Sequence, residues 1–249
     1  MPAAATILGS GGFIPTGARE TSSLLLLDAA GDGAVVVDAG TGLRRLITDR
    51  ALLRGRTRLD VLLTHFHIDH ICGLAYLTEL RGVEVCVHGP GAALYGTPTA
   101  DVLHRLFSVP IMPIDFGVIG VGVAEIAPGG ARFGGLEVAV RRQDLHTNPT
   151  LGFRFGDDLV WCTDTEEDPG TVAFARGARV LAHDAWGPPA APGHAEPAGA
   201  ARLATQAGVP RLVLIHVPPN ADEADLHARA AAEHEHVTVA TDGLALLDL

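Results

Sequence analysis

The stretch Thr64-His65-Phe66-His67-Ile68-Asp69-His70 follows the apolar run Val61-Leu62-Leu63 and gathers three imidazoles and a carboxylate within a few residues. If the chain is extended up to His67, the side chains of His65 and His67 point to the same side, because side chains alternate along a strand. Asp69 and His70 lie where the chain is expected to turn into a helix. Imidazole nitrogens and carboxylate oxygens are ligands that zinc, manganese and iron accept in proteins. The spacing therefore predicts two metal ions, one held by His65 and His67 and the other by Asp69 and His70.

The composition describes a chain that can bury a large core. It has 249 residues, of which 47% are hydrophobic, so one large domain or two intimately packed halves would both fit. We expect a single domain over residues 1–249. The formal net charge is −11, and all 18 basic residues are arginine. A broad basic surface for nucleic acid is therefore not favoured, although a local arginine patch is compatible with the composition.

The cysteines and the first residues of the chain indicate the cellular compartment of the protein. Cys72, Cys86 and Cys162 are odd in number and lie in or beside apolar runs, which is typical of buried thiols in a reducing compartment. The first residues lack the basic segment of a signal peptide, and no apolar run approaches the ~18 residues of a membrane span. We therefore expect a cytoplasmic protein with no membrane partner.

Apolar runs alternate with helix-like segments along the chain. Ser23–Leu27 and Ala34–Asp38 flank the turn Ala30-Gly31-Asp32-Gly33 and predict an antiparallel hairpin. Leu43–Leu53 is helix-like, and Leu59–Thr64 is predicted as the strand that delivers the histidine cluster. Each half of the chain has strands followed by helices, which predicts an α+β fold with two stacked β-rich halves.

Two segments are less regular. The glycine-rich loop Gly9–Gly17 is either a tight turn or a place where the backbone approaches a phosphate. In Gly89–Gly130, proline and glycine recur among apolar residues, in a pattern that is neither cleanly helical nor alternating. A segment of this kind usually covers a substrate cleft or a subunit interface, and we expect a homodimer.

Three further ligand-type residues, His146, Asp164 and His216, each follow an apolar strand. A two-metal site needs more ligands than the cluster offers, and burying three such groups for unrelated reasons would be costly, so we predict that they complete the site. Asp38 also ends a buried strand and is predicted either to orient a metal-binding histidine or to cap the next helix. The remaining histidines considered, which lack this context, are expected on the surface or in loops: His88, His104, His227, His234 and His236.

In order and context these residues resemble the metal motifs of the metallo-β-lactamase superfamily, over nearly the whole chain. Leu8–Thr16 is similar to the N-terminal loop of its ribonuclease Z branch, and His146–Phe153 to that branch's third motif. The resemblance implies a four-layer αββα sandwich with the site at one edge. Zinc is the expected metal, with manganese or iron as alternatives. The implied ligands are His65, His67 and His146 for one ion, Asp69, His70 and His216 for the other, and Asp164 as the bridge.

Two more motifs carry the resemblance. Ala182-His183-Asp184-Ala185 is similar to the branch's His-Glu-Ala-Thr motif with Asp replacing Glu, and Gly193-His194-Ala195 to its His-Ser-Thr loop with Ala replacing Ser. By this resemblance His194, oriented by Asp184, contacts the phosphate and protonates the leaving oxygen. An ordinary loop salt bridge is the alternative for this pair, and a structural role is the alternative for His183. Asp69 is predicted to be catalytic as well as a ligand.

The favoured function is a di-metal hydrolase that cleaves a phosphodiester bond with a metal-activated hydroxide. The alternatives are ribonuclease Z-type 3′ processing of RNA, hydrolysis of a lactam, lactone or thioester, and metal binding without catalysis. Ribonuclease Z enzymes insert a long arm that grips transfer RNA between the third and fourth motifs, whereas Thr147–Thr163 here is filled by two predicted strands. The acidic net charge also disfavours RNA. A small phosphodiester, such as a cyclic nucleotide or cyclic sugar phosphate, is therefore predicted over RNA.

Overall fold

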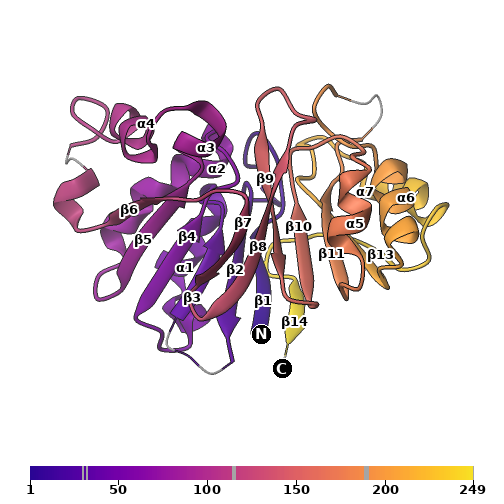
Figure 1. Cartoon of the computed structure of the whole chain (residues 1–249), viewed down its shortest axis with the longest axis horizontal. Helices are drawn as coiled ribbons and strands as arrows, with labels where there is room; N and C mark the ends of the chain where they lie inside the picture. Colours follow the sequence, from indigo (N-terminus) through magenta and orange to yellow (C-terminus); the bar gives the residue numbers. More distant parts are fainter. Residues whose placement is uncertain (30, 32, 114–115, 188–190, 249) are drawn as a thin grey trace.

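The computed structural model describes residues 1–29, 31, 33–113, 116–187 and 191–248, and within these ranges the strands form two seven-stranded sheets (Figure 1). The first sheet has the order β14 (Ala245–Asp248), β1 (Pro2–Gly9), β2 (Ser23–Asp28), β3 (Gly33–Val37), β4 (Arg58–Leu62), β5 (Glu84–Gly89) and β6 (Gly122–Glu125). The second has the order β13 (Val237–Val239), β12 (Arg211–Ile215), β11 (Val180–Asp184), β10 (Leu159–Cys162), β9 (Thr150–Phe155), β8 (Leu136–Gln143) and β7 (Gly129–Phe133).

The two sheets share one apolar core. Leu24 and Val35 of the first sheet belong to the same buried cluster as Phe153 and Trp161 of the second. Every residue of β2 and β3 is buried, as expected for strands that are covered on both faces. The continuous apolar runs in the sequence therefore correspond to the inner strands of a sandwich.

Helices cover the outer face of each sheet. The first sheet is covered by α1 (Arg44–Thr48), η3 (Cys72–Glu79) and α4 (Thr99–Leu106), which contribute to a second apolar cluster. The second sheet is covered by α5 (Gly170–Ala175), α6 (Pro197–Ala207) and α7 (Glu223–Ala231), seen at the right of Figure 1. The predicted four-layer αββα sandwich is confirmed. Among the described residues, no helix is long and apolar enough to cross a membrane.

The local predictions hold in part. β2 and β3 pair antiparallel as predicted, although Ala30 and Asp32 of the predicted turn lie outside the described residues. The helix-like segment Leu43–Leu53 is helical, but it is not one continuous helix. It is divided into η1 (Thr41–Leu43), α1 and η2 (Arg50–Leu53), because the Asp49 backbone leaves the helical region and its carboxylate accepts a hydrogen bond from the Ala51 N–H.

The segment Gly89–Gly130 is more regular than predicted. It contains α3 (Gly91–Tyr95), α4, η4 (Phe116–Ile119) and the edge strand β6. Leu103 and Phe107 pack into the cluster on the outer face of the first sheet. Part of this segment therefore belongs to the outer helical layer, and its predicted role in a homodimer stays a prediction.

Candidate metal centre

The histidine cluster lies just beyond the C-terminal end of β4. His67 is extended and begins the short helix α2 (Ile68–Ile71), so the chain turns between His67 and Asp69 as the sequence predicts. The His65 ring lies 4.4 Å from the His67 ring and 4.3 Å from the His70 ring, measured between centroids. One short turn thus brings these imidazoles together.

The second sheet supplies the other three predicted ligands from the same edge. β8, β10 and β12 run in one direction, because β9 is antiparallel to both β8 and β10, and β11 is parallel to β10 and β12. His146, Asp164 and His216 follow these strands and therefore meet at one end of the sheet. A backbone hydrogen bond of 2.9 Å from the Leu151 N–H to the Thr64 carbonyl ties this end to the first sheet.

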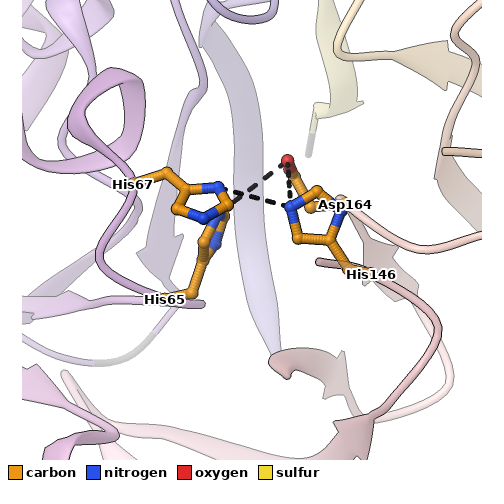
Figure 2. Close-up of side chains that lie close together, drawn as sticks. All are labelled: His65, His67, His146 and Asp164. Atoms are coloured by element: carbon orange, nitrogen blue, oxygen red, sulfur yellow. Dashed lines mark hydrogen bonds and ion pairs between the residues drawn. The ribbon is translucent and has the colours of Figure 1, made fainter. Parts of the chain in front are cut away.

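The Asp164 carboxylate lies between two groups of ligands. Its Oδ1 is 3.9 Å from His65 Nε2 and 3.7 Å from His146 Nε2, and its Oδ2 is 3.2 Å from His70 Nε2. Figure 2 shows Asp164 facing the imidazoles of the first group. The donor atoms within each group lie within 4.8 Å of one another, which suits a metal ion; the groups are His65, His67, His146 and Asp164, and Asp69, His70 and His216.

Hydrogen bonds behind the rings orient three of the histidines. His70 Nδ1 donates to Asp38 Oδ2 at 2.8 Å, and His146 Nδ1 donates to the Gly193 carbonyl at 2.8 Å. His65 Nδ1 lies 2.9 Å from the Thr64 hydroxyl, which donates to Asp38. With Nδ1 engaged, each Nε2 is left as the ligand atom. Asp38 thus orients candidate ligands rather than capping a helix.

The buried nitrogens fit a metal ion. His65 Nε2 is buried and has no hydrogen-bond partner, and its 3.9 Å separation from Asp164 Oδ1 is too long for a hydrogen bond. A metal ion between these atoms would satisfy both, since a buried polar atom without a partner is costly. The donor set therefore fits the metal ions that it predicts.

Charge within the site also favours cations. Burial opposes ionisation of Asp69 and Asp164, but the charges and hydrogen bonds of His70 and His216 outweigh it and hold the pKa of both carboxyls below the usual range. Burial likewise lowers the pKa of the two histidines, but nearby carboxylates raise the pKa of His216 to about 9 and that of His70 well above its ordinary value. A divalent ion would take the place of these protons.

Asp184 and His194 meet at the edge of this centre. Asp184, the last residue of β11, is fully buried, and its Oδ2 accepts a hydrogen bond of 2.7 Å from His194 Nδ1. The His194 ring lies 4.9 Å from the His146 ring and 5.2 Å from the His216 ring. His194 also forms a third group of metal-type residues with Asp164 and His216, so its geometry admits a ligand role as well as a catalytic one. His183 is buried, and its Nδ1 pairs with the neighbouring carbonyl of Asp184 at 3.0 Å.

The sequence did not single out several residues that contact the site. The Phe13 N–H donates to Asp69 Oδ2 at 2.9 Å, and Asn148 Oδ1 lies 3.1 Å from His67 Nε2. A Cβ at Gly12 would lie 2.4 Å from the His216 ring, which explains the glycine-rich loop as a place of close approach to a ligand residue. Trp186 stacks on His194 at 4.9 Å. Trp186 stands where the ribonuclease Z motif has threonine, a departure that was visible in the sequence.

His88 corrects another expectation. It was predicted on the surface or in a loop, but it lies in β5 with little exposure, and its Nε2 is 2.7 Å from Asp60 Oδ1. Asp60 and His88 form a separate cluster with Cys86. The error arose because Asp60 and His88 are paired through strand neighbours β4 and β5, which spacing along the sequence does not reveal.

Comparisons with known proteins identify the family of the chain. The model of the β-lactamase superfamily domain matches residues 34–217. Ribonuclease Z of Mycobacterium sp. (strain KMS) is 32% identical over 257 aligned residues, covering 91% of this chain and 89% of that protein. Ribonuclease Z of Methanopyrus kandleri is 27% identical and covers 95% of each chain.

Solved structures show the same fold. The metallo-β-lactamase fold protein YhfI from Bacillus subtilis has a TM-score of 0.79 and 20% identity, covering 98% of this chain and 99% of its own. The short form of human tRNase Z has a TM-score of 0.71 and 21% identity, covering 97% and 98%. The family model and the sequence relatives extend across the strands that carry the histidines and aspartates described above. The chain belongs to the metallo-β-lactamase superfamily, in its ribonuclease Z-like branch, and is a metal-dependent hydrolase.

Proposed function

We propose that this hydrolase cleaves a phosphodiester bond at a centre of two divalent metal ions. The observation that carries the proposal is the position of Asp164 between the two groups of imidazoles. Its Oδ1 lies 3.7 Å from His146 Nε2 of the first group and 3.5 Å from His216 Nε2 of the second, and its Oδ2 lies 3.2 Å from His70 Nε2. The first ion would be held by His65, His67 and His146, and the second by Asp69, His70 and His216, with Asp164 as the bridge. Two such ions would supply an activated water and would neutralise charge on the phosphoryl oxygens.

His194 and Asp184 support phosphodiester chemistry in particular. A ring bonded to Asp184 through Nδ1 presents Nε2 as a proton donor to the oxygen that leaves phosphorus. The buried Asp184 carboxylate fixes the orientation of this imidazole through that hydrogen bond. A lactam, lactone or thioester hydrolase remains the alternative within the same fold.

Two arguments about the substrate favour different candidates, RNA and a small phosphodiester. Relatives named ribonuclease Z, matched over most of their length, favour RNA and count against the preference for a small phosphodiester that we predicted from the sequence. A small phosphodiester is retained as a second candidate on one observation: β9 and β10 are joined by a short turn, so Thr147–Thr163 contains no long arm. The acidic net charge supports the same candidate.

The proposal is tested with metal-loaded protein and a panel of substrates. Bis-p-nitrophenyl phosphate should be hydrolysed, whereas a β-lactam, a lactone and a thioester should not. A precursor transfer RNA and a cyclic phosphodiester, assayed at physiological salt, separate the two candidate substrates. Turnover of the lactone or thioester without turnover of any phosphodiester would reject the proposal.

The purified protein is expected to carry about two metal ions per chain, because seven ligand-type residues converge in two groups. Zinc is the expected ion, since imidazole and carboxylate ligands suit it, and manganese or iron fit the same donors. Elemental analysis of the purified protein measures this stoichiometry. Absence of bound metal, with no recovery of metal or activity on adding zinc or manganese, would contradict the prediction.

Asp38→Asn is expected to weaken metal binding by about 10- to 100-fold, because the amide cannot accept hydrogen bonds from both Thr64 and His70 in the way the carboxylate does. Competition with a chromogenic chelator measures the change. Asp60→Asn is the matched control. Like Asp38, Asp60 accepts a hydrogen bond from a histidine, but this histidine is His88 in the separate cluster. Equal metal affinity in the two variants would show that Asp38 does not orient the ligands.

A further inference from the structure

A pocket of about 570 Å³ opens beside the metal centre. Its walls include Trp186, Pro218 and Pro219, and Leu226 of α7. Its volume lies in the range of small-ligand pockets, about 300–1,000 Å³. Pro218 follows closely after His216, so this wall is continuous with a ligand residue of the centre.

Trp186 connects the pocket to the catalytic residues. The ring is half-buried, lies 4.9 Å from the His194 ring at an interplanar angle of 26°, and lies 5.4 Å from the His216 ring. Its backbone N–H donates to the Ala195 carbonyl at 2.9 Å, which fixes it against the loop that carries His194. Trp186 thus stacks directly on His194, the residue assigned to protonating the leaving oxygen.

The charges on the pocket exclude a second phosphate. Asp222 and Asp225 lie on its rim, and no arginine, lysine or histidine is among the described residues that line it. A phosphate placed there would meet these carboxylates and find no cation among the described lining residues, since the nearby Arg229 is already paired with Asp225 at 2.7 Å. The pocket therefore suits an uncharged part of the substrate. Its acceptors for N–H groups are Asn220 and the carboxylate oxygens that the Asp222 helix cap and the Asp225–Arg229 pair leave unused.

We infer that this pocket binds a nucleobase next to the scissile phosphate, and that Trp186 is the residue on which the base stacks. A flat aromatic base fits apolar walls that carry a few hydrogen-bond acceptors at the rim, and bases stack on aromatic side chains whatever their sequence. The inference rests on the proposed phosphodiesterase function and makes it specific, because it assigns recognition of a base to this pocket and to Trp186. Trp186 is then a specificity-determining residue rather than part of the bond-breaking machinery.

The first test compares two esters with the same leaving group. These are the p-nitrophenyl ester of thymidine 5′-phosphate and methyl p-nitrophenyl phosphate. Trp186→Leu, which keeps an apolar side chain but removes the aromatic face, should raise KM for the thymidine ester about tenfold. KM for the methyl ester should change less than about twofold, and Trp186→Phe should restore most of the affinity for the thymidine ester, because it restores an aromatic face.

A binding measurement gives a readout that does not require turnover. Adenosine 5′-monophosphate should quench the tryptophan fluorescence of the metal-loaded protein, and ribose 5-phosphate at the same concentration should not. Trp161, the other tryptophan, is 1% exposed in the core between the sheets, so quenching by stacking reports on Trp186. Trp186→Leu should abolish this quenching although Trp161 remains.

The outcomes separate the two proposals. If wild-type protein cleaves neither ester, the phosphodiesterase function is rejected, and the fluorescence titration alone decides whether the pocket binds a base. If both esters are cleaved and Trp186→Leu raises both KM values equally, or lowers kcat alone, the base-binding role is overturned while the function stands. Equal quenching by the nucleotide and by ribose 5-phosphate would also overturn it.

Discussion

Asp164→Asn should lower bound metal from about two ions per chain to one or fewer, and turnover should fall to that of the metal-free protein. The amide keeps the volume of the carboxylate, so the buried space stays filled, but it lacks the negative charge and the second anionic oxygen. In the native chain these oxygens lie 3.9 Å from His65 Nε2 and 3.2 Å from His70 Nε2. Weakening both contacts loosens a side chain that joins the two groups. Elemental analysis and an assay on bis-p-nitrophenyl phosphate measure the two effects.

The matched control for this variant is Asp168→Asn. Asp168 also lies in the loop between β10 and α5, but its carboxylate pairs with Arg141 at 2.7 Å. This control should retain metal and turnover, while thermal unfolding of both metal-free variants checks that each is folded. Two bound ions and near-native turnover in Asp164→Asn would show that Asp164 does not bridge.

The convergence of the candidate ligands was predictable where these residues follow a simple rule of position. His65 and His67 share a side because an extended chain alternates, and Asp69 follows because the chain turns into α2. His146, Asp164 and His216 were found because each ends an apolar strand, and strands that run in the same direction end at the same edge of a sheet. The resemblance to known motifs then supplied the order of the ligands. The αββα layers followed from the same runs of apolar residues.

Contacts set by the path of loops were not predictable in this way. Phe13 and Asp69 follow different strands of the first sheet, and Trp186 stacks on His194 because the loop between β11 and α6 folds back on itself. Nothing in local periodicity encodes either contact. The break at Asp49 was missed for a different reason. A side-chain cap there outweighs the helical preference of its neighbours, and apolar spacing does not register such a cap.

His194→Ala should lower turnover of a phosphodiester with an alkyl or nucleoside leaving group by about 10²- to 10⁴-fold while both metal ions are retained. The reason is that His194 is held through Nδ1 by Asp184 and is assigned to the leaving oxygen, not to coordination. Asp184→Asn should give a smaller loss, because the imidazole remains but is oriented less firmly. The double variant should be little worse than His194→Ala, since the two residues act as a unit. Steady-state kinetics and elemental analysis are done on the same preparations.

The leaving group distinguishes protonation from simple phosphate binding. A p-nitrophenolate departs without a proton, so His194→Ala should cost far less on bis-p-nitrophenyl phosphate than on the alkyl ester if its role is that of an acid. If His194 merely positioned the phosphate, His194→Ala would lower turnover of both esters by the same factor. Loss of metal from His194→Ala would instead assign the ring to coordination, as its grouping with Asp164 and His216 permits. Two measurements on His194→Ala therefore decide the role of this side chain: the ratio of the turnover lost on the alkyl ester to that lost on bis-p-nitrophenyl phosphate, and the metal content. Together they show whether His194 acts as a general acid, as a phosphate contact or as a metal ligand.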